Sequence, residues 1–368
     1  MQNIFLKLAD KKNLTVEEAK FGALEIFDEL TSNKPDVVAK MATFFGGLTE
    51  KNVTVEELTG IAQAMDLTKT YLFDFGINEP LVTAGGTGGD SFPTINVTTP
   101  AVIIAAAAGA YALKSGAKAF SSKTGSSDLA LQLGINTHAP PEVVKDCVKE
   151  IKLTCWASEC VYPWMSPLIS TGKKEQIQNI MPMLYSLRLA IASALNPFSL
   201  KRQVRGVSKP FTQTIAQVLS NCGYEKALVV LGHGEKENIR IDEISNLGKT
   251  IISELKPNGE IETYQICPED LGIKKGEKTQ ILSRDSHFEN AKIIYEILSG
   301  KDTTSRKDLI LINSAAILYT ADKVKNLKDG YQLSKKTLEE GKALEKLWQL
   351  VTLSRGRIDK LKTIIGFN

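Results

Sequence analysis

The sequence predicts an α/β protein that begins with a helical segment, and three observations support this prediction. The 368 residues suffice for two domains or for one large domain. Residues 1–75 show helical periodicity alone. From residue 78 onward, short β-type runs alternate with helical stretches and glycine-rich turns, which is typical of a sheet covered by helices.

The helices of the first segment have recognisable starting points. Thr15 and Thr54 are each followed three residues later by a glutamate, Glu18 and Glu57. This is the capping-box pattern, in which the threonine and the glutamate satisfy backbone N–H groups at the start of a helix. We therefore expect several short amphipathic helices before residue 76.

The β-type runs that follow are short. We expect strands at residues 81–83, 117–120, 227–231, 262–266 and 309–312. The longest apolar run, residues 101–113, is rich in alanine and predicts one buried helix, because its 13 residues are too few to cross a membrane.

A second helical interval covers residues 164–194 and ends at Asn196-Pro197. Two arrangements are consistent with it. The interval either adds two helices to the α/β layers, or returns to the amino-terminal helices and forms a discontinuous helical domain beside a cleft. Periodicity alone favours neither arrangement.

The composition excludes several classes of function. A net charge of +3 without any basic stripe gives no support for nucleic-acid binding. No membrane span or targeting segment is visible, so we expect a cytoplasmic location and no membrane partner. The five cysteines form no C-x-x-C pair and are expected to be reduced structural thiols. The three histidines are isolated in the sequence, so we expect neither a histidine-based metal site nor a Ser/His/Asp triad.

The first candidate site residues lie in a glycine-rich turn. Gly85-Gly-Thr-Gly-Gly-Asp90 follows the expected strand at residues 81–83, and its glycines allow backbone N–H groups to approach an anion. Thr94-Ile-Asn-Val-Thr-Thr99-Pro100 then leads into the alanine-rich run. With Thr98 or Thr99 as the cap and Pro100 at the first helical position, this helix start would attract phosphate. A structural turn and ordinary helix caps are the alternative explanation.

Two further polar segments are candidates for the same chemistry. Residues 114–128 are dense in hydroxyls, glycines and lysines, which are suitable donors for phosphate oxygens, although a solvated loop would have the same composition. Asp242 and Glu243 are adjacent carboxylates between isoleucines. Such a pair suits Mg²⁺ held mainly by substrate phosphates and water, but a single pair is weak support by itself.

Together these motifs make the chain resemble anthranilate phosphoribosyltransferase, of glycosyltransferase family 3 and the nucleoside phosphorylase/phosphoribosyltransferase class II fold. The resemblance extends from the first helices to about Ser354. It rests on Gly86-Thr-Gly-Gly-Asp90, Thr94-Ile-Asn-Val-Thr-Thr99, Lys114 with Ser121-Ser122 and Gly125-Ser-Ser-Asp128, Lys201-Arg-Gln-Val-Arg-Gly-Val207, Asp242-Glu243-Ile-Ser245 and Asn313-Ser-Ala-Ala, in that order.

The resemblance implies a particular domain organisation. A small discontinuous helical domain would comprise residues 1–75 and 164–197. A larger α/β domain with a central, mostly parallel sheet would comprise residues 76–163 and 198–368. The resemblance also implies a homodimer formed through the helical domain, with the substrate site at the hinge between the domains.

The resemblance further implies 5-phosphoribosyl pyrophosphate (PRPP) as the donor, Mg²⁺ as the cofactor, and a role for each matching residue. Lys114 and Asp90 would be catalytic. The metal would be held by Thr98, Asp242 and Glu243. The residues that would bind the donor are Gly86, Thr87, Gly88, Gly89, Asp90, Thr94, Asn96, Thr98, Thr99, Lys114, Ser121, Ser122 and Ser126.

The acceptor side departs from the family pattern. Where the family has Lys-His-Gly-Asn-Arg, this chain has Lys114-Ser-Gly-Ala117-Lys118, so the histidine and the asparagine that faces anthranilate are missing. Tyr162 replaces the family's histidine before proline. The acceptor-side candidates are Ala117, Tyr162, Lys173, Asn179 and Arg188.

We therefore expect a phosphoribosyltransferase that transfers to the nitrogen of an aromatic acceptor, resembling the enzyme of tryptophan biosynthesis but with an altered acceptor pocket. Its expected partners are small-molecule substrates. Two alternatives are a pyrimidine nucleoside phosphorylase-like enzyme, which shares the glycine loop and the Lys-Ser-Ser segment, and a non-catalytic binding paralogue.

Overall fold

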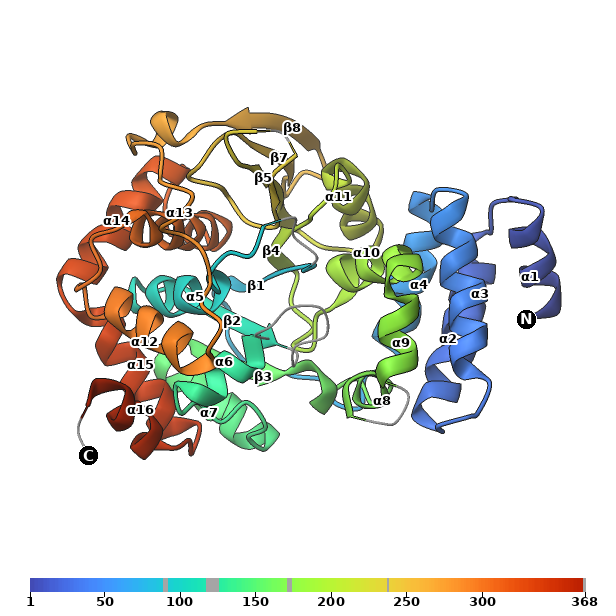
Figure 1. The fold of residues 1–368 in the computed structure, drawn as a ribbon, viewed down its shortest axis with the longest axis horizontal. Coiled ribbons are helices and arrows are strands. Elements are labelled where there is room, and N and C mark those ends of the chain that lie inside the picture. The colour runs from blue at the N-terminus through green and yellow to red at the C-terminus, as the bar shows by residue number, and fades with distance from the viewer. Residues whose placement is uncertain (89–91, 117–125, 171–173, 237, 367–368) are drawn as a thin grey trace.

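The computed structural model describes residues 1–88, 92–116, 126–170, 174–236 and 238–366. The chain begins with a helical bundle, on the right in Figure 1. Both capping boxes are confirmed, because the Thr15 and Thr54 side chains accept from the N–H groups of Glu18 and Glu57. The bundle helices are α1 (Gln2–Ala9), α2 (Val16–Thr31), α3 (Val37–Glu50) and α4 (Val55–Leu67).

Eight strands of the described chain form one sheet, in the order β3-β2-β1-β4-β5-β7-β8, with β6 paired to β5. The first five strands in this order are parallel, whereas β6, β7 and β8 pair antiparallel. The predicted α/β class with a mostly parallel sheet is therefore confirmed. The strands are β1 (Leu81–Gly86), β2 (Tyr111–Gly116), β3 (Leu153–Ala157), β4 (Arg202–Gly206), β5 (Lys226–His233), β6 (Arg240–Ile241), β7 (Thr250–Leu255) and β8 (Ile261–Ile266).

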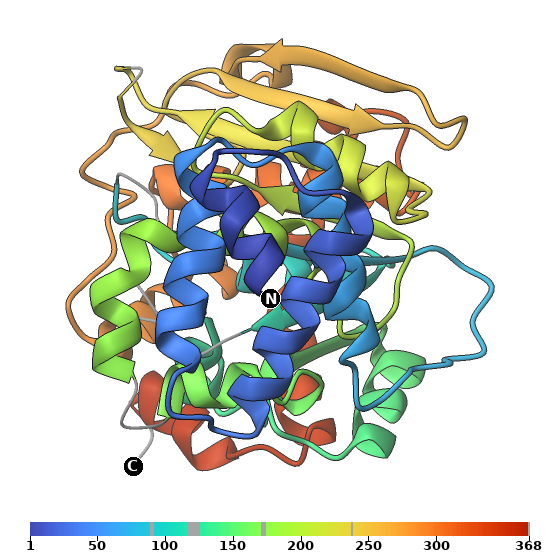
Figure 2. The same ribbon diagram turned by 90° about the vertical axis from the view of Figure 1, so that its right-hand side faces the viewer.

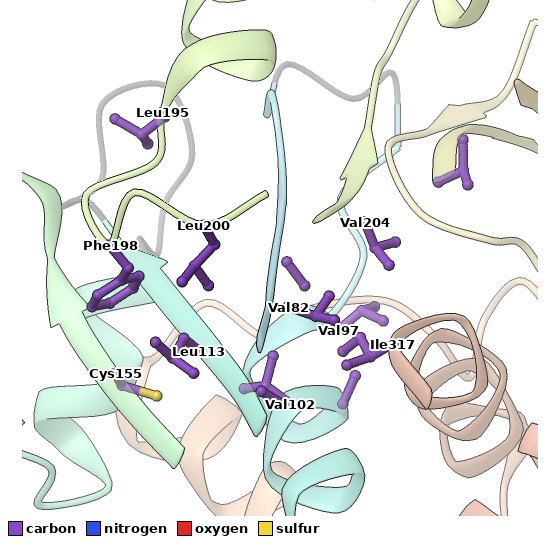
Figure 3. Close-up of a cluster of buried hydrophobic side chains, with 14 of the residues drawn as sticks. Val82, Val97, Val102, Leu113, Cys155, Leu195, Phe198, Leu200, Val204 and Ile317 are labelled. Carbon is purple, nitrogen blue, oxygen red and sulfur yellow. The ribbon is translucent and has the colours of Figure 1, made fainter. Parts of the chain in front are cut away.

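Helices cover the sheet on both faces (Figure 1). Figure 3 shows the core beneath one face, where Val82 and Val204 of the sheet meet Val102 and Ile317 of two covering helices. The helices around the sheet are α5 (Thr98–Ala107), α6 (Ser126–Gln132), α7 (Pro141–Ile151), α11 (Thr212–Asn221), α12 (His287–Leu298), α13 (Ser305–Thr320), α14 (Leu327–Glu339), α15 (Lys342–Leu353) and α16 (Ile358–Ile365), with the 3₁₀ turns η1 (Ser158–Cys160) and η3 (Pro268–Leu271).

The second helical interval packs against the amino-terminal helices. The Ser186 hydroxyl donates to the Phe45 carbonyl at 2.7 Å, and the Trp164 ring stacks on Phe27. Figures 1 and 2 show these segments side by side, although they are far apart in the sequence. The interval therefore returns to the amino-terminal helices, and its assignment to a discontinuous domain beside a cleft stays a prediction. The interval contains α8 (Met165–Ser170), α9 (Lys174–Ile180), η2 (Met181–Leu184) and α10 (Tyr185–Ala194).

Two element predictions are wrong. Residues 101–113 do not form one helix, because α5 ends at Ala107 and, after Gly109 with a φ of +101°, the chain continues as β2. Residues 309–312 lie inside α13 and not in a strand. Both runs are buried almost throughout, so they have no periodicity that separates helix from strand. The strand expected at residues 117–120 lies outside the described residues.

None of the helices in the described ranges is long and apolar enough to cross a membrane.

Candidate active site

The glycine-rich turn after β1 is held against the segment that carries Asp242. The Gly88 N–H donates to Asp242 Oδ2 at 2.6 Å, and Gly88 has a φ of +64°. A Cβ atom on Gly86 would lie 2.0 Å from Asp242 Oδ2, and one on Gly206 would lie 1.4 Å from the Asp242 carbonyl oxygen. Only glycine at both positions allows β1 and β4 to approach this residue so closely.

In the described part of the turn, two further polar contacts are made by backbone groups. The Thr87 N–H donates to the Gly206 carbonyl at 3.1 Å, and the Ser208 hydroxyl donates to the Gly88 carbonyl at 3.3 Å. The Thr87 hydroxyl is buried and has no partner among the described residues. Two predicted members of the donor set, Gly89 and Asp90, lie outside the described residues.

The start of α5 lies beside the turn. The N-cap position is Val97, not Thr98 or Thr99, and the Asn96 side chain before it accepts from the Thr99 N–H at 3.2 Å. Pro100 is the third helical residue and not the first. Thr94 lies outside the helix and forms a bridge to Leu282. Pro100 has no N–H group, and the N–H groups of Thr99 and Ala101 donate to Asn96 and to the Val97 carbonyl. The helix dipole and the Thr98 N–H are therefore what this helix start offers to an anion.

Lys114 on β2 is a buried cation. Its side chain is 7% exposed, and its ammonium donates to the Ser115 carbonyl. Burial lowers the pKa of Lys114 to about 8, and the positive charge of Arg205 lowers it too. The carboxylates of Asp242 and Glu243 raise it and offset part of this effect. Lys114 is therefore only partly charged near pH 8 before an anion arrives.

The hydroxyls predicted to accompany Lys114 are described only in part. A Cβ atom on Gly116 would lie 3.0 Å from Ser126 Oγ, so this hydroxyl lies over the end of β2. Ser121 and Ser122 lie outside the described residues.

Asp242 and Glu243 follow β6 and line a small cavity of about 20 Å³ together with Thr98 and Asn313. Glu243 Oε2 is buried without a partner among the described residues. Burial raises the pKa of the Glu243 carboxyl well above its usual range, and the neighbouring Asp242 raises it further. A pair of carboxylates in this state favours the arrival of a cation.

Asn313 on α13 holds this segment in place. Its side chain accepts from the Ile244 N–H at 3.0 Å and donates to the Ile244 carbonyl at 2.9 Å. In the sequence Asn313 stood out only as part of a motif, because its contact with residue 244 depends on the packing of α13 under the sheet. The clamp fixes the backbone next to the two carboxylates.

The acceptor-side candidates lie in different surroundings. Tyr162 is fully buried, and its hydroxyl accepts from the Asn196 N–H at 3.2 Å. Asn179 is exposed on α9, whereas Arg188 is partly buried on α10 beside Tyr185. Ala117 and Lys173 lie outside the described residues.

Tyr185 connects α10 to the glycine-rich turn. Its hydroxyl is buried without a well-aligned hydrogen-bond partner in the described ranges, and it lies close to Ser208. The Lys209 ammonium lies 3.8 Å from the centre of its ring. Through Tyr185, the second helical interval thus reaches the same end of the strands as the residues expected to bind phosphate.

One charged residue was missed by the sequence reasoning. Arg205 on β4 is 2% exposed, and its Nη2 donates to the Leu195 carbonyl at 3.0 Å and to Gln203 Oε1 at 2.9 Å. Its Nε is buried without a partner in the described part of the chain. The available signal was an arginine between Val204 and Gly206 in a strand buried on both faces, where a charge is unusual.

Comparison with known proteins agrees with this geometry. A family model for the glycosyl transferase family, a/b domain, matches residues 78–344. The chain is 35% identical to the anthranilate phosphoribosyltransferase of Methanosphaera stadtmanae, over 93% of this chain and 96% of the relative. It is 32% identical to that of Acetivibrio thermocellus, over 96% of both.

Solved structures have the same fold. The anthranilate phosphoribosyltransferase of Thermus thermophilus superposes with a TM-score of 0.80 at 26% identity, covering 96% of this chain and 99% of that one. The Saccharomyces cerevisiae enzyme, solved in complex with PRPP and Mg, superposes with a TM-score of 0.78 at 22% identity, covering 96% and 97%.

The fold and the family match define the class as a glycosyl transferase with an α/β domain. Within this class the chain belongs to the anthranilate phosphoribosyltransferase family and is a phosphoribosyltransferase.

Proposed function

We propose that this chain transfers the 5-phosphoribosyl group from PRPP to the nitrogen of an aromatic acceptor, with Mg²⁺ as the cofactor. One observation carries the proposal. A buried ammonium on Lys114, the Gly88–Asp242 contact and the start of α5 all lie near the carboxyl ends of β1, β2 and β4. In parallel sheets this edge is where ligands bind. The names of the relatives support the same reaction class.

The reaction depends more on stabilising the departing pyrophosphate than on a protein nucleophile. The Lys114 ammonium and the Thr98 N–H at the start of α5 are preorganised donors for its oxygens. An acceptor amine that is already neutral can attack C1 of the ribose without a catalytic base. Asp90 stays a catalytic candidate from the resemblance.

The residues present fit a magnesium ion. Asp242 and Glu243 supply hard carboxylate oxygens, and no described residue competes for a hydrogen bond with Glu243 Oε2. Within the described ranges, no group of three or more His, Cys, Asp or Glu forms a closed cage. An ion held there would take its other ligands from the donor and water, and when bound it would neutralise the charge of the leaving pyrophosphate.

We also propose that the acceptor pocket differs from that of the anthranilate enzymes. Ser115 and Ala117 stand where the family motif has histidine and asparagine, and neither side chain can replace both hydrogen-bonding functions. A Saccharomyces cerevisiae relative of the same fold was solved with 4-fluoroanthranilate. We therefore favour an aromatic acid similar in shape to anthranilate as the acceptor.

The proposal includes a homodimer and a cytoplasmic location. Large apolar side chains on the helical bundle, Leu6 and Phe21, are about half exposed or more, which supports an interface there. All five cysteines are unpaired, which supports a reducing compartment.

Calorimetry of PRPP binding, with and without Mg²⁺, tests the proposal. We expect PRPP to bind the wild type only with Mg²⁺, and we expect pyrophosphate to be released when an aminobenzoate is added. The double variant Asp242→Asn, Glu243→Gln should lose about 10²-fold or more in turnover, whereas Glu262→Gln on the exposed β8 should keep wild-type activity.

Other results would redirect the assignment. Binding of phosphate with uridine or thymidine would favour the pyrimidine nucleoside phosphorylase alternative. A wild type that PRPP and Mg²⁺ fail to stabilise against heat would favour the non-catalytic paralogue, since a ligand of the native state must raise its melting temperature. Near-normal turnover of the double variant would contradict the magnesium assignment.

A further inference from the structure

Arg205 is a buried guanidinium that forms no salt bridge with the described residues, although the Asp242 carboxylate lies near enough to favour its charge. Nη2 is satisfied by the Leu195 carbonyl and by Gln203, but Nε is buried without a partner. The part of the chain that the structure describes supplies no ion pair to this side chain. Burying an unpaired charge destabilises the folded protein, so an arginine at this buried position of the sheet needs an explanation.

The neighbouring strands make room for this side chain. Gly85 of β1 pairs with Arg205, and a Cβ atom on Gly85 would lie 2.7 Å from Nη1. Because Ala84 pairs with Lys114, the next residue of β2, Ser115, is the neighbour of Gly85 on the far side. The row Ser115–Gly85–Arg205 therefore has two small residues beside one long cation, and Ser115 is where the family motif has histidine.

A second cation lies close to the first. The Lys114 ammonium would lie 4.0 Å from a Cβ atom on Gly85, and each of the two positive charges disfavours the other. The nearby carboxylate of Asp242 is already engaged by the Gly88 N–H. Lys114 and Arg205 are thus two buried, positively charged side chains close together near the carboxyl ends of neighbouring strands, an arrangement that favours an oxyanion.

The surroundings of Arg205 distinguish the acceptor from the donor. Its guanidinium contacts the Leu195 carbonyl at the end of α10, on the side of the second helical interval. The buried ring of Tyr162 and the partly buried ring of Tyr224 lie near it. Burial raises the pKa of both phenols, and the Arg205 charge partly opposes this rise. Aromatic walls around a cation suit an aromatic acid better than a diphosphate.

We propose that Arg205 binds the carboxylate of the acceptor, in a chain that lacks the family's histidine and acceptor-facing asparagine. The inference rests on the proposed function, because it names the residue that sets the acceptor class. Arg205 is thus a specificity-determining residue: the enzyme selects aromatic amines that carry an acidic group. Donor binding depends on the other groups at the edge.

Matched ligands test the proposal. Anthranilate and 2-aminobenzamide have the same ring and amine but differ in charge, and both are titrated into the protein with Mg²⁺ and pyrophosphate. We expect the wild type to bind the acid more tightly. Arg205→Met should reduce that preference about 10- to 100-fold, the range of a hydrogen bond to a charged group, and should leave PRPP affinity within about twofold. Arg205→Lys should retain part of the preference.

Two further variants serve as comparisons. Arg188→Met removes the other arginine on the acceptor side and should change the preference less than Arg205→Met does. Arg202→Met removes a cation from the same strand, where Arg202 pairs with Asp322, and should change neither preference nor PRPP affinity.

The outcomes separate this inference from the proposed function. A wild type that binds PRPP but shows no preference for the acid overturns the inference alone, as does an unchanged preference in Arg205→Met. Equal losses of PRPP and anthranilate binding would assign Arg205 to the donor. Replacing a buried charge by an apolar side chain of similar volume is often neutral or stabilising. A lowered melting temperature of Arg205→Met with an unchanged preference would therefore show that Arg205 supports the structure through its bond to the Leu195 carbonyl. Absence of PRPP binding to the wild type would contradict the proposed function itself.

Discussion

Lys114 is buried in β2, and its pKa is lower than that of an ordinary lysine. Burial lowers the pKa of Lys114 to about 8, so the ligand-free side chain loses its proton as the pH rises through that value. We therefore expect the affinity for PRPP to decrease above pH 8, as measured by calorimetry across pH 7–10. The donor phosphates are almost fully ionised throughout this range and contribute no matching change.

A charge-conserving variant is the control. Arginine stays protonated across the whole range, so Lys114→Arg should show a flatter pH profile than the wild type, even if its affinity is lower. A wild-type affinity that is constant from pH 7 to 10 would mean that Lys114 does not contact the donor.

Candidate site residues that belong to local motifs could be proposed from the sequence, whereas a candidate that depends on distant neighbours could not. Lys114, Asp242 and Glu243 belong to short patterns whose chemistry is evident from adjacent letters. Arg205 acquires its meaning only from Gly85, which is 120 positions earlier and pairs with it across the sheet. Such pairings depend on strand order, which the sequence does not state.

At the scale of elements, the two capping boxes have the same motif in different surroundings. Glu57 is fully buried, and besides its cap contact it accepts from the Leu14 N–H at 2.8 Å and pairs with Lys51 at 2.7 Å. Glu18 caps α2 in the same way but is partly exposed beside Lys7. The same substitution should therefore have unequal effects.

We expect Glu57→Ala to lower the free energy of unfolding by about 3–5 kcal/mol, because it removes the carboxylate from the buried Lys51 ammonium and leaves two backbone N–H groups without an acceptor. Glu18→Ala should cost about 1 kcal/mol or less, since water replaces its contacts. Urea unfolding followed by circular dichroism measures both. Similar losses in the two variants would show that burial of Glu57 adds nothing to its capping role.

The elements that were predicted well are those with a polar face or a marked start. The amphipathic helices of the bundle formed as expected, and the strands expected at 227–231 and 262–266 agree with β5 and β8. The errors at residues 101–113 and 309–312 occur where apolar residues face protein on nearly every side. There the choice between helix and strand is made by tertiary packing, here with help from Gly109 at the turn.

At the scale of the whole molecule, the proposed dimer has a direct test. Leu6 is 60% exposed and Phe21 is 49% exposed on the helical bundle. We expect the wild type to sediment at twice the chain mass of 40.2 kDa, and the variant Leu6→Glu, Phe21→Glu to sediment as a monomer. Leu72→Glu, which replaces a similarly exposed leucine outside the helices, should remain dimeric. A monomeric wild type at micromolar concentration would contradict the proposal.

Trp164 lies where the chain leaves the α/β part and returns to the bundle. Its ring stacks on Phe27 with centroids 4.3 Å apart, and its Nε1 donates to the Thr68 hydroxyl at 2.9 Å. A fully enclosed indole emits at shorter wavelength than a hydrated one, and Trp164 is fully buried. The junction between the two parts of the molecule therefore contains an intrinsic fluorophore, and separation of the two segments would be visible as a red shift of tryptophan emission without any added label.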